Sequence, residues 1–300
     1  MPTPALQRVG LLVNPVSGRG RARAYGEAVR ERLTGAGHRV LDVSGRDGAQ
    51  AQARASAAVA AGDLDVLAVV GGDGTAHLGA NVCAQTGIPL AIVAAGTGND
   101  NARGLGLPRA EPTRMADLVT AGRLRDIDAG RARTDRGDRW FLGVLGGGFD
   151  TVVSDRAARM RWVHGTPRYV AAVLRELPTF RGIRYAVQVD DQRIETTAML
   201  VAVANGRSFG AGMLVCPDAQ VDDGLFDVMV LHRISVAEFL RVFPTVFSGR
   251  HVHHPAVEIR RGTRVVLEAS GVRAQADGEP FESLPLTLEV VPGALRVVVP

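Results

Sequence analysis

The sequence predicts an α/β domain with a parallel sheet, followed by an antiparallel β-sandwich. Up to about residue 122, apolar runs typical of buried strands alternate with helical stretches, as in a parallel sheet covered by helices on both faces. From about residue 123, many short β-runs are separated by turns, which is typical of an antiparallel sandwich. Because 300 residues exceed the usual size of a single core, we expect two domains, 1–122 and 123–293. A last strand near 294–300 can pair in either domain.

In the first domain, strands are expected where aliphatic residues run together, and helices in the stretches that join them. The strands are expected at 9–13, 38–43, 66–70 and 89–93, and the helices at 19–34, 47–61, 76–85 and 111–120. In the second domain, short strands are expected at 124–129, 140–145, 184–190, 194–204, 226–231, 257–259, 265–267 and 286–290, with helices near 166–177 and 236–247.

The composition is that of an ordinary soluble globular protein, with 46% hydrophobic and 22% charged residues. No apolar run approaches the roughly 18 residues that span a bilayer, and residues 1–8 lack the hydrophobic core of a signal sequence. The 2 cysteines lie far apart, which neither demands a disulfide nor offers a zinc spacing. We therefore expect a cytoplasmic protein.

All 35 Lys+Arg residues are arginine. A P-loop requires Gly-Lys-Ser/Thr, so phosphoryl transfer here has to use backbone amides, metal ions or arginine. The net charge of +4 attracts anionic lipid headgroups, and we expect transient peripheral contact with an anionic membrane. Nucleic-acid binding is not expected, because the chain has no aromatic run, zinc finger or basic block.

Residues Gly71-Gly72-Asp73-Gly74-Thr75 directly follow an apolar run. Three glycines around one carboxylate let the backbone approach a ligand closely and expose its N–H groups, which suits phosphate oxygens. Asp73 is placed to meet a metal ion or a sugar hydroxyl. A tight turn between a strand and a helix also explains Gly-Asp-Gly, so this motif alone leaves both interpretations open.

Two further loops favour a nucleotide site. The apolar runs at 9–13 and 89–93 lead into Asn14-Pro15-Val16-Ser17-Gly18 and Gly96-Thr97-Gly98-Asn99-Asp100. In an open parallel sheet such loops emerge at the carboxyl edge of the strands, so three segments far apart in sequence converge on one crevice. Turn chemistry alone does not account for three loops in the same structural position.

With these loops in place, the sequence resembles the diacylglycerol kinase catalytic family, which includes bacterial lipid kinases and sphingosine kinases. The resemblance covers nearly the whole chain. It rests on Asn14 to Gly18, Gly71 to Thr75, Gly96 to Asp100 with Ala102-Arg103, Asn205-Gly206 through Gly210, Gly212, Pro217, Ala219, Asp223, Gly224 and Asp227, and Asp277-Gly278-Glu279. It implies an amino-terminal nucleotide domain like that of NAD kinase and phosphofructokinase, and a carboxy-terminal sandwich that contributes the lipid site. It also implies ATP-dependent phosphorylation of a lipid hydroxyl, that of diacylglycerol or a related lipid alcohol.

The resemblance also implies roles for single residues. It places ATP against Asn14, Pro15, Ser17, Gly18, Gly71, Gly72, Asp73, Gly74, Thr75, Thr97 and Asn99, with Ser44 at a position where the family often has a threonine that touches ATP. Asp73 and Asp100 would hold the catalytic Mg²⁺ through water, and Glu279 would be the general base. Asp223, with the backbone carbonyls of Gln220 and Leu225, resembles a second magnesium site that is structural in the family.

Some features leave alternatives open. Asp277-Gly278 and Asp223-Gly224 are also strong β-turn signals. After Thr75 the family usually continues Leu-Asn-Glu, whereas this chain has Ala76-His77-Leu78, and Asn101 replaces a common aromatic residue. Segment 161–170 mixes arginines with Trp162 and Tyr169, as interfacial contacts do, although a helix that covers the sandwich is an equal alternative. The competing functions are an NAD kinase, a phosphofructokinase-like sugar kinase, and a lipid-binding regulator that is catalytically weak. A homodimer also stays open.

Overall fold

The chain folds into two compact units. The computed structural model describes residues 6–134, 137–149, 151–153, 156 and 166–300, and the side chains of 166–170 lie outside this description. Unit 1 comprises Met1–Ala129 with Val291–Pro300, and unit 2 comprises Gly130–Val290. The boundary expected after residue 122 lies just before a long strand, β5 (Leu124–Thr134), in which the chain passes from unit 1 to unit 2.

Unit 1 is built on a parallel sheet, as the sequence predicts. Its strands are β1 (Arg8–Val13), β2 (Arg39–Asp42), β3 (Val66–Gly71) and β4 (Leu90–Ala94). They lie in the order β4-β3-β1-β2, and β3 and β4 are buried along their whole length. The end of the last strand, β15 (Leu286–Val298), runs parallel to β4 through the pair Val297 and Leu90.

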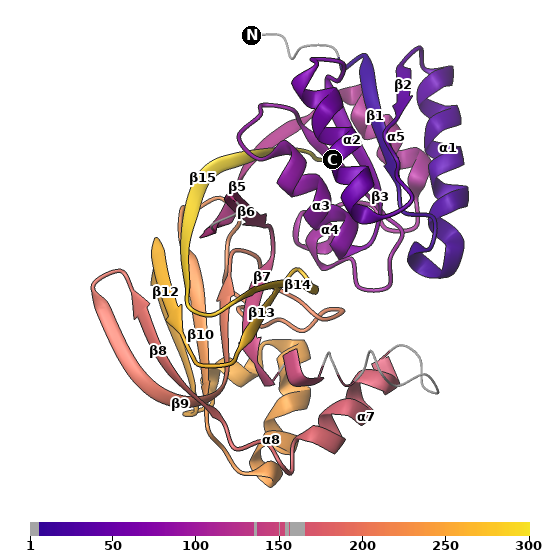
Figure 1. Ribbon diagram of the computed structural model, residues 1–300. Helices are drawn as coiled ribbons and strands as arrows, with labels where there is room; N and C mark the ends of the chain where they lie inside the picture. Colours follow the sequence, from indigo (N-terminus) through magenta and orange to yellow (C-terminus); the bar gives the residue numbers. More distant parts are fainter. Residues whose placement is uncertain (1–5, 135–136, 150, 154–155, 157–165) are drawn as a thin grey trace. The chain divides into compact units, whose positions relative to one another are not determined.

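Helices lie on both sides of this sheet (Figure 1). They are α1 (Arg21–Gly35), α2 (Gly48–Ala60), α3 (Asp73–Cys83), α4 (Asp100–Gly104) and α5 (Pro112–Ala121). α1 packs against α5, and α2 against α3. α2 starts after Asp47, whose side chain accepts a hydrogen bond from the backbone N–H of Gln50 at 2.8 Å.

Three helix starts differ from the sequence-based expectation, and all three lie in the glycine-rich loops. The helix expected from residue 19 begins at Arg21, because Ser17–Gly20 form a separate short 3₁₀ turn in which Gly18 and Arg19 have positive φ. α3 begins at Asp73, three residues before the expected start, and α4 was not expected. These starts bring carboxylates to the first turn of two helices.

Unit 2 is an antiparallel β-sandwich, which confirms the predicted fold class. Besides β5, its strands are β6 (Gly137–Phe141), β7 (Val144–Gly148), β8 (Ile183–Val189), β9 (Gln192–Ala204), β10 (Phe226–His232), β11 (Val257–Gly262), β12 (Arg264–Glu268), β13 (Arg273–Ala276) and β14 (Glu279–Ser283). The long strand β9 pairs with β8 along its first half and with β7 along its second, while β10 pairs with β9 and β11.

Two strand predictions in the second half were wrong in detail. The run at 140–145 is not one strand, because Leu142 and Gly143 interrupt it and separate β6 from β7. The runs at 286–290 and 294–299 are one continuous strand, β15. In the first case the two residues leave the ladder and donate their N–H groups to the Asp277 carboxylate instead.

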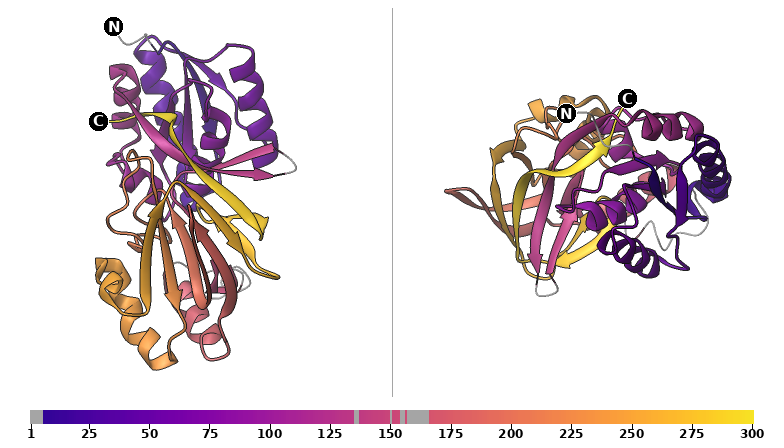
Figure 2. Two further views of the ribbon diagram at one scale, coloured as in Figure 1. Left: turned by 90° about the vertical axis from the view of Figure 1, so that its left-hand side faces the viewer. Right: turned by 90° about the horizontal axis from the view of Figure 1, so that it is seen from above.

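The core of unit 2 lies between its strands, where Phe141 and Phe226 stack with ring centroids 5.7 Å apart. A second apolar cluster lies under α7 (Thr166–Glu176), α8 (Val236–Val242) and the 3₁₀ turn η2 (Phe243–Ser248). These helical segments gather at one end of the strands (Figure 2). Among the described residues, no helix is long and apolar enough to cross a membrane.

Candidate functional site

The three glycine-rich loops of unit 1 meet at the carboxyl edge of its sheet. Gly18 has a φ of 59°, and a Cβ atom there would lie 1.8 Å from the carbonyl oxygen of Ala95. A Cβ on Gly96 would lie 2.4 Å from the Cα of Gly72. Only glycine allows backbones to approach this closely, so these contacts explain why glycines occupy the loops after β1, β3 and β4.

Backbone and side-chain hydrogen bonds of Asn14 also join the first two loops. The Asn14 backbone N–H donates to the Val70 carbonyl oxygen at 3.0 Å, and its Nδ2 donates to Thr75 Oγ1 at 3.4 Å. The structure thereby brings the predicted residues Asn14, Pro15, Ser17 and Gly18 together with Gly71, Gly72, Gly74 and Thr75.

The third loop is closed by Asn99, which adopts a left-handed backbone conformation with a φ of 56°. The Gly96 N–H donates to Asn99 Oδ1 at 2.9 Å, and Asn99 Nδ2 donates to the Gly96 carbonyl at 2.9 Å. This reciprocal pair leaves Thr97 exposed at the tip of the loop. Asn99 therefore shapes the loop through its side chain, and Thr97 is the residue presented to solvent.

Ser44 adjoins the same edge through the end of β1. Its hydroxyl oxygen accepts the Val13 N–H at 3.0 Å, while its own backbone N–H donates to Asp42 Oδ1 at 2.9 Å. Ser44 thus holds the end of the strand that leads into Asn14.

Asp73 and Asp100 are the first residues of α3 and α4, two helices that start at this edge. The backbone N–H of Asn101 donates to Asp73 Oδ1 at 3.1 Å, which ties the start of α4 to the start of α3. Asp100 is buried and forms an ion pair with Arg103 at 2.5 Å, and Arg103 also donates to the Gly98 carbonyl at 3.1 Å. Mg²⁺ is usually bound through one or two carboxylates together with phosphate and water oxygens. The two carboxylates of Asp73 and Asp100 fit this ion. An ion at Asp100 would compete with the Arg103 guanidinium for the carboxylate.

A polar cavity of about 380 Å³ lies on the α1 side of the third loop. Arg21 and Tyr25 of α1 line it together with Arg109 and Glu111. Arg21 Nε donates to the Gly18 carbonyl at 3.0 Å, which anchors its guanidinium at the first loop. The sequence motifs did not single out Arg21 or Arg109, because neither belongs to a glycine-rich loop at this edge.

In unit 2, Glu279 is the first residue of β14, directly after the turn of the β13–β14 hairpin. It is exposed. Within the described part of the chain, no hydrogen bond or ion pair holds its carboxylate. Such a group can accept a proton from an incoming hydroxyl without first breaking an internal contact.

Asp223 lies in the connection that leads into β10, with Gln220 and Leu225 on either side. Its Oδ1 accepts the Leu225 N–H at 3.1 Å, and its Oδ2 pairs with Arg261. Arg261 also lies 3.5 Å from Oδ1 of Asp227, which is only 4% exposed. Within the described ranges, Oδ2 of Asp227 has no hydrogen-bond partner. Burial raises the pKa of Asp227.

The charge on Asp223 is therefore already balanced in part by the Arg261 guanidinium. Among the described residues, no group of three or more His, Cys, Asp and Glu side chains is placed to hold a metal. A structural ion at Asp223 would rely on this one carboxylate and on backbone carbonyls, and it would compete with Arg261.

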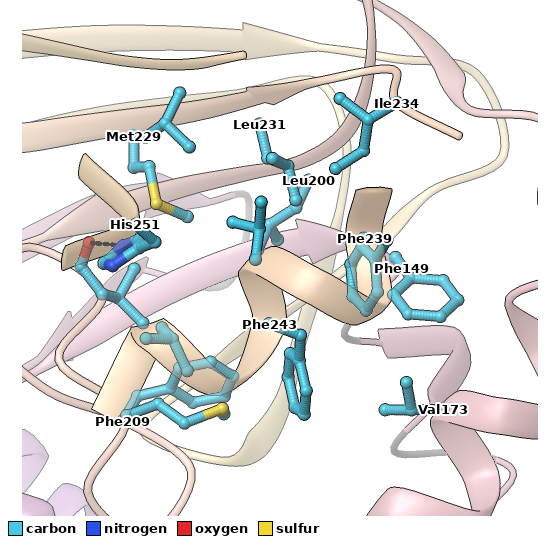
Figure 3. Close-up of a pocket in the computed structure, with 15 residues that line it drawn as sticks. Phe149, Val173, Leu200, Phe209, Met229, Leu231, Ile234, Phe239, Phe243 and His251 are labelled. Carbon is cyan, nitrogen blue, oxygen red and sulfur yellow. Dashed lines mark hydrogen bonds between the residues drawn. The ribbon is translucent and has the colours of Figure 1, made fainter. Parts of the chain in front are cut away.

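Unit 2 also contains an apolar cavity of about 80 Å³, which the sequence did not reveal (Figure 3). Its wall includes Leu200 from β9, Leu231 from β10, Phe239 from α8 and Phe243 from η2. Figure 3 shows Phe239 at one end and His251 at the other. The residues come from strands, a helix and a 3₁₀ turn, so no single segment of sequence carries the pattern of this cavity.

His251 is the polar member of this wall and is 5% exposed. Its Nε2 lies 3.1 Å from the Val215 carbonyl oxygen and therefore carries the proton, whereas its buried Nδ1 has no hydrogen-bond partner among the residues that the structure describes. Burial lowers the pKa of His251, so the imidazole is neutral at physiological pH.

Comparison with known proteins decides the family. Residues 8–132 match the diacylglycerol kinase catalytic domain, and residues 143–299 match the YegS C-terminal NAD kinase beta sandwich-like domain. A Mycobacterium tuberculosis protein described as a diacylglycerol kinase is 41% identical over 98% of this chain and 95% of its own length. The chain belongs to the diacylglycerol kinase family. It is therefore a lipid kinase by family.

Further relatives agree with this diacylglycerol kinase assignment. A Bacillus subtilis protein described as a diacylglycerol kinase is 28% identical over 93% of this chain and 92% of its own length. A crystal structure described as that of a diacylglycerol kinase from Bacillus anthracis has a TM-score of 0.73 at 21% identity, covering 98% of this chain and 97% of that one. At this identity the structural match supports the fold alone.

Proposed function

We propose that the protein is an ATP- and Mg²⁺-dependent lipid kinase that transfers the γ-phosphate of ATP to the hydroxyl of diacylglycerol or a related lipid alcohol. The observation that carries the proposal is the convergence of the three loops of unit 1, with Asp73 and Asp100 at the starts of α3 and α4. Backbone N–H groups at glycine-rich turns and helix starts favour phosphate oxygens.

In this proposal the chain positions the reactants and neutralises charge. The loops at Asn14 to Gly18 and Gly71 to Thr75 bind the phosphates through backbone amides, and Thr97 and Ser44 contact the nucleotide. Asp73 and Asp100 hold Mg²⁺ through water. Bound Mg²⁺ supplies neutralisation of the charge on the transferred phosphoryl group.

In this proposal, arginine makes the cationic contacts with the nucleotide phosphates that lysine makes in P-loop enzymes. Arg21 and Arg109 line the polar cavity beside Thr97, and among the described residues no ion pair neutralises either guanidinium. Arginine forms planar, bidentate contacts with phosphate oxygens. We assign to these two side chains the cationic contacts with the phosphates of the nucleotide.

Glu279 is assigned as the general base that takes the proton from the lipid hydroxyl. The carboxylate is exposed, and no hydrogen bond or ion pair from the described residues has to be broken before it accepts a proton. A positioned carboxylate of this kind typically contributes about 10²- to 10⁴-fold to the rate.

The apolar cavity of unit 2 is assigned to the acyl chain of the lipid. Its volume of about 80 Å³ is roughly half that of a 150 Å³ cavity that binds benzene, so it holds only a short piece of chain as it stands. A longer chain requires Phe239 or Phe243 to rotate, or α8 and η2 to shift. Each buried methylene then contributes about 0.8 kcal/mol with little discrimination between chains.

A membrane contact completes the proposal. Four large apolar side chains near this cavity are exposed: Leu174 on α7, Val236 and Leu240 on α8, and Phe247 on η2. We propose that this group, the apolar rim, touches the lipid surface from which the substrate comes. The sequence also suggested segment 161–170 as an interfacial contact. Residues 161–165 and the side chains of residues 166–170 lie outside the described part of the chain.

The deciding experiment incubates the protein with radiolabelled ATP, with or without Mg²⁺, and with a panel of acceptors that contains diacylglycerol, monoacylglycerol, ceramide, sphingosine and NAD. We expect label in a lipid product, and only with Mg²⁺. Label in NADP alone would replace the lipid kinase with an NAD kinase, and lipid binding without transfer would favour a regulator.

The structural magnesium at Asp223, with the carbonyls of Gln220 and Leu225, remains part of the proposal. The measurement is thermal unfolding of wild type and Asp223→Asn with and without Mg²⁺, in the absence of nucleotide. A bound ion stabilises only the protein that binds it, so wild type should gain more in melting temperature. An equal rise in melting temperature for both proteins would contradict a magnesium site at Asp223 and leave Arg261 as the partner of this carboxylate.

A further inference from the structure

The hairpin that carries Glu279 is anchored by an unusual turn residue. Asp277 and Gly278 connect β13 to β14 with φ values of 54° and 84°, the signs of a two-residue type I′ turn. The pair Ala276 and Glu279 closes this turn. The position of Glu279 therefore follows directly from the position of Asp277.

Turn residues at hairpin tips are normally solvated, but Asp277 is only 6% exposed. Its Oδ1 accepts the Gly143 N–H at 2.7 Å, and its Oδ2 accepts the Leu142 N–H at 3.0 Å. Its own N–H donates to the Val144 carbonyl at 3.0 Å. Two hydrogen bonds, both strengthened by the carboxylate charge, thus tie the turn to the segment between β6 and β7, and a third ties it to the first residue of β7.

That segment is itself held by Asn205, which follows β9. Asn205 Nδ2 donates to the Leu142 carbonyl at 2.8 Å. The backbone N–H groups of Asn205 and Gly206 donate to the Gly143 carbonyl at 2.8 and 3.0 Å. A continuous chain of hydrogen bonds therefore runs from the residues that follow β9 through residues 142–143 to the turn before Glu279.

The β8–β9 hairpin shows what a turn aspartate does without such burial. Asp190 also has positive φ, 49°, and its carboxylate also accepts two backbone N–H groups, from Thr263 at 3.0 Å and Arg264 at 2.9 Å. Asp190 is exposed. Gln192, which follows this turn as Glu279 follows the other, has no proposed role in the reaction. Closing a hairpin in this fold therefore does not require a buried carboxylate.

We propose that Asp277 is a positioning residue that fixes the Glu279 carboxylate for proton transfer, and that Asn205 supports it through residues 142–143. This inference rests on the proposed function, in which Glu279 is the base. A displacement of about 1 Å at a reacting group can cost about 10²-fold in rate, so rigid anchoring of an otherwise free carboxylate has a catalytic consequence.

The test is a double-mutant cycle between Asp277→Asn and Glu279→Gln, with Asp190→Asn as the matched control. Asparagine tolerates positive φ, so the turn is kept, but it replaces one acceptor oxygen with an amide that cannot accept an N–H. Turnover and KM for ATP are measured with the best lipid acceptor, together with the melting temperature.

We expect Asp277→Asn to lower turnover by about 10- to 100-fold at nearly unchanged KM for ATP. In the Glu279→Gln background the same change should have no further effect, because the base through which it acts is gone. Asp190→Asn should leave turnover within about twofold of wild type. Equal losses from Asp277→Asn in both backgrounds would mean general structural damage and overturn the inference, as would wild-type turnover of Asp277→Asn.

Two readouts separate this inference from the proposed function. If Glu279→Gln alone keeps full turnover, the base assignment fails and the positioning role falls with it, while lipid kinase activity stands. If wild type phosphorylates no lipid, amide hydrogen exchange still reports the anchor: Leu142 and Gly143 should lose protection in Asp277→Asn and keep it in Asp190→Asn. Unchanged protection in both variants would show that the carboxylate does not hold the turn.

Discussion

Single residues of unit 1 owe their identity to close backbone contacts. Gly18 and Gly96 stand where a Cβ atom would lie 1.8 and 2.4 Å from the backbone of another loop. Asp73 is different, because its carboxylate accepts the Asn101 N–H at 3.1 Å and brings a negative charge to the same edge of the sheet. The glycines build the site, and the aspartate gives it charge.

Asp73→Asn tests this charge. Asparagine keeps the acceptor oxygen for Asn101, so the fold and the melting temperature should stay close to wild type. Turnover with ATP and the accepted lipid should fall by at least about 10²-fold, because charge neutralisation is the largest catalytic contribution to phosphoryl transfer. Steady-state kinetics at saturating Mg²⁺ measure the change. Near-normal turnover would reject the metal role of Asp73.

His251 predicts a pH dependence of stability. Burial lowers its pKa in the folded protein below the ordinary value of 6.5, so below that pH the unfolded chain binds more protons than the folded one. The free energy of unfolding should therefore fall as the pH drops through about 6.5 and continue to fall down to the pKa of the folded state.

The comparison is with His251→Gln, which keeps a side-chain N–H for the Val215 carbonyl but does not titrate. Denaturant unfolding from about pH 8 to about pH 5 should show a steeper loss for wild type, by at most about 1.4 kcal/mol per pH unit. Parallel curves for the two proteins would contradict a buried neutral imidazole.

Elements of unit 2 enclose the apolar cavity from several directions. Leu200 and Leu231 are paired residues on β9 and β10, and α8 and η2 contribute Phe239 and Phe243, whose rings stack at 5.5 Å. Phe239 and Phe243 belong to no strand, so a chain that enters by separating these rings breaks no strand ladder.

Leu200→Asn places an amide in this wall. We expect the KM for the lipid to rise about tenfold or more, because apolar contact is lost and a polar group must be desolvated. The KM for ATP should not change, since the nucleotide is assigned to unit 1. The matched control is Leu41→Asn on β2, where leucine is 38% exposed. A rise in the KM for ATP, or equal effects of both variants, would remove the acyl assignment.

For the molecule as a whole, net charge and exposed apolar side chains support the proposed contact with a lipid surface. The net charge is +4, and the apolar rim consists of Leu174 on α7, Val236 and Leu240 on α8, and Phe247 on η2. Apolar insertion together with arginine attraction is the usual combination for reversible peripheral binding.

Sedimentation with anionic vesicles tests this contact. Binding should be weak and should fall with added salt, since each arginine near the surface contributes up to about 1 kcal/mol that salt screens. Leu240→Glu should reduce binding, and Leu41→Glu, with the same charge change in unit 1, should reduce it less. Absence of binding at low salt, or equal loss in both variants, would refute the role of the apolar rim.

The fold class and the three loops of unit 1 could be predicted before the structure was known, because both depend on local signals. Aliphatic runs specify buried parallel strands, and the glycine-rich segments after β1, β3 and β4 follow from the rule that such loops share one sheet edge. Asn14 to Gly18, Gly71 to Thr75 and Gly96 to Asp100 could be named from the sequence, although their roles in binding stay predictions. The interruption at Leu142 and Gly143 could not be predicted, because it depends on hydrogen bonds to the distant Asp277.

Features that depend on contacts between residues far apart in the sequence could be found in the folded structure alone. Asp277 and Gly143 are 134 positions apart, and their hydrogen bond turns a plain Asp-Gly turn signal into a buried anchor. The Arg21 contact with Gly18, the Arg261 pair with Asp223 and the His251 position in the apolar cavity are of the same kind. Side-chain burial and charge pairing are set by what packs against a residue, and a local sequence pattern carries no information about that neighbour.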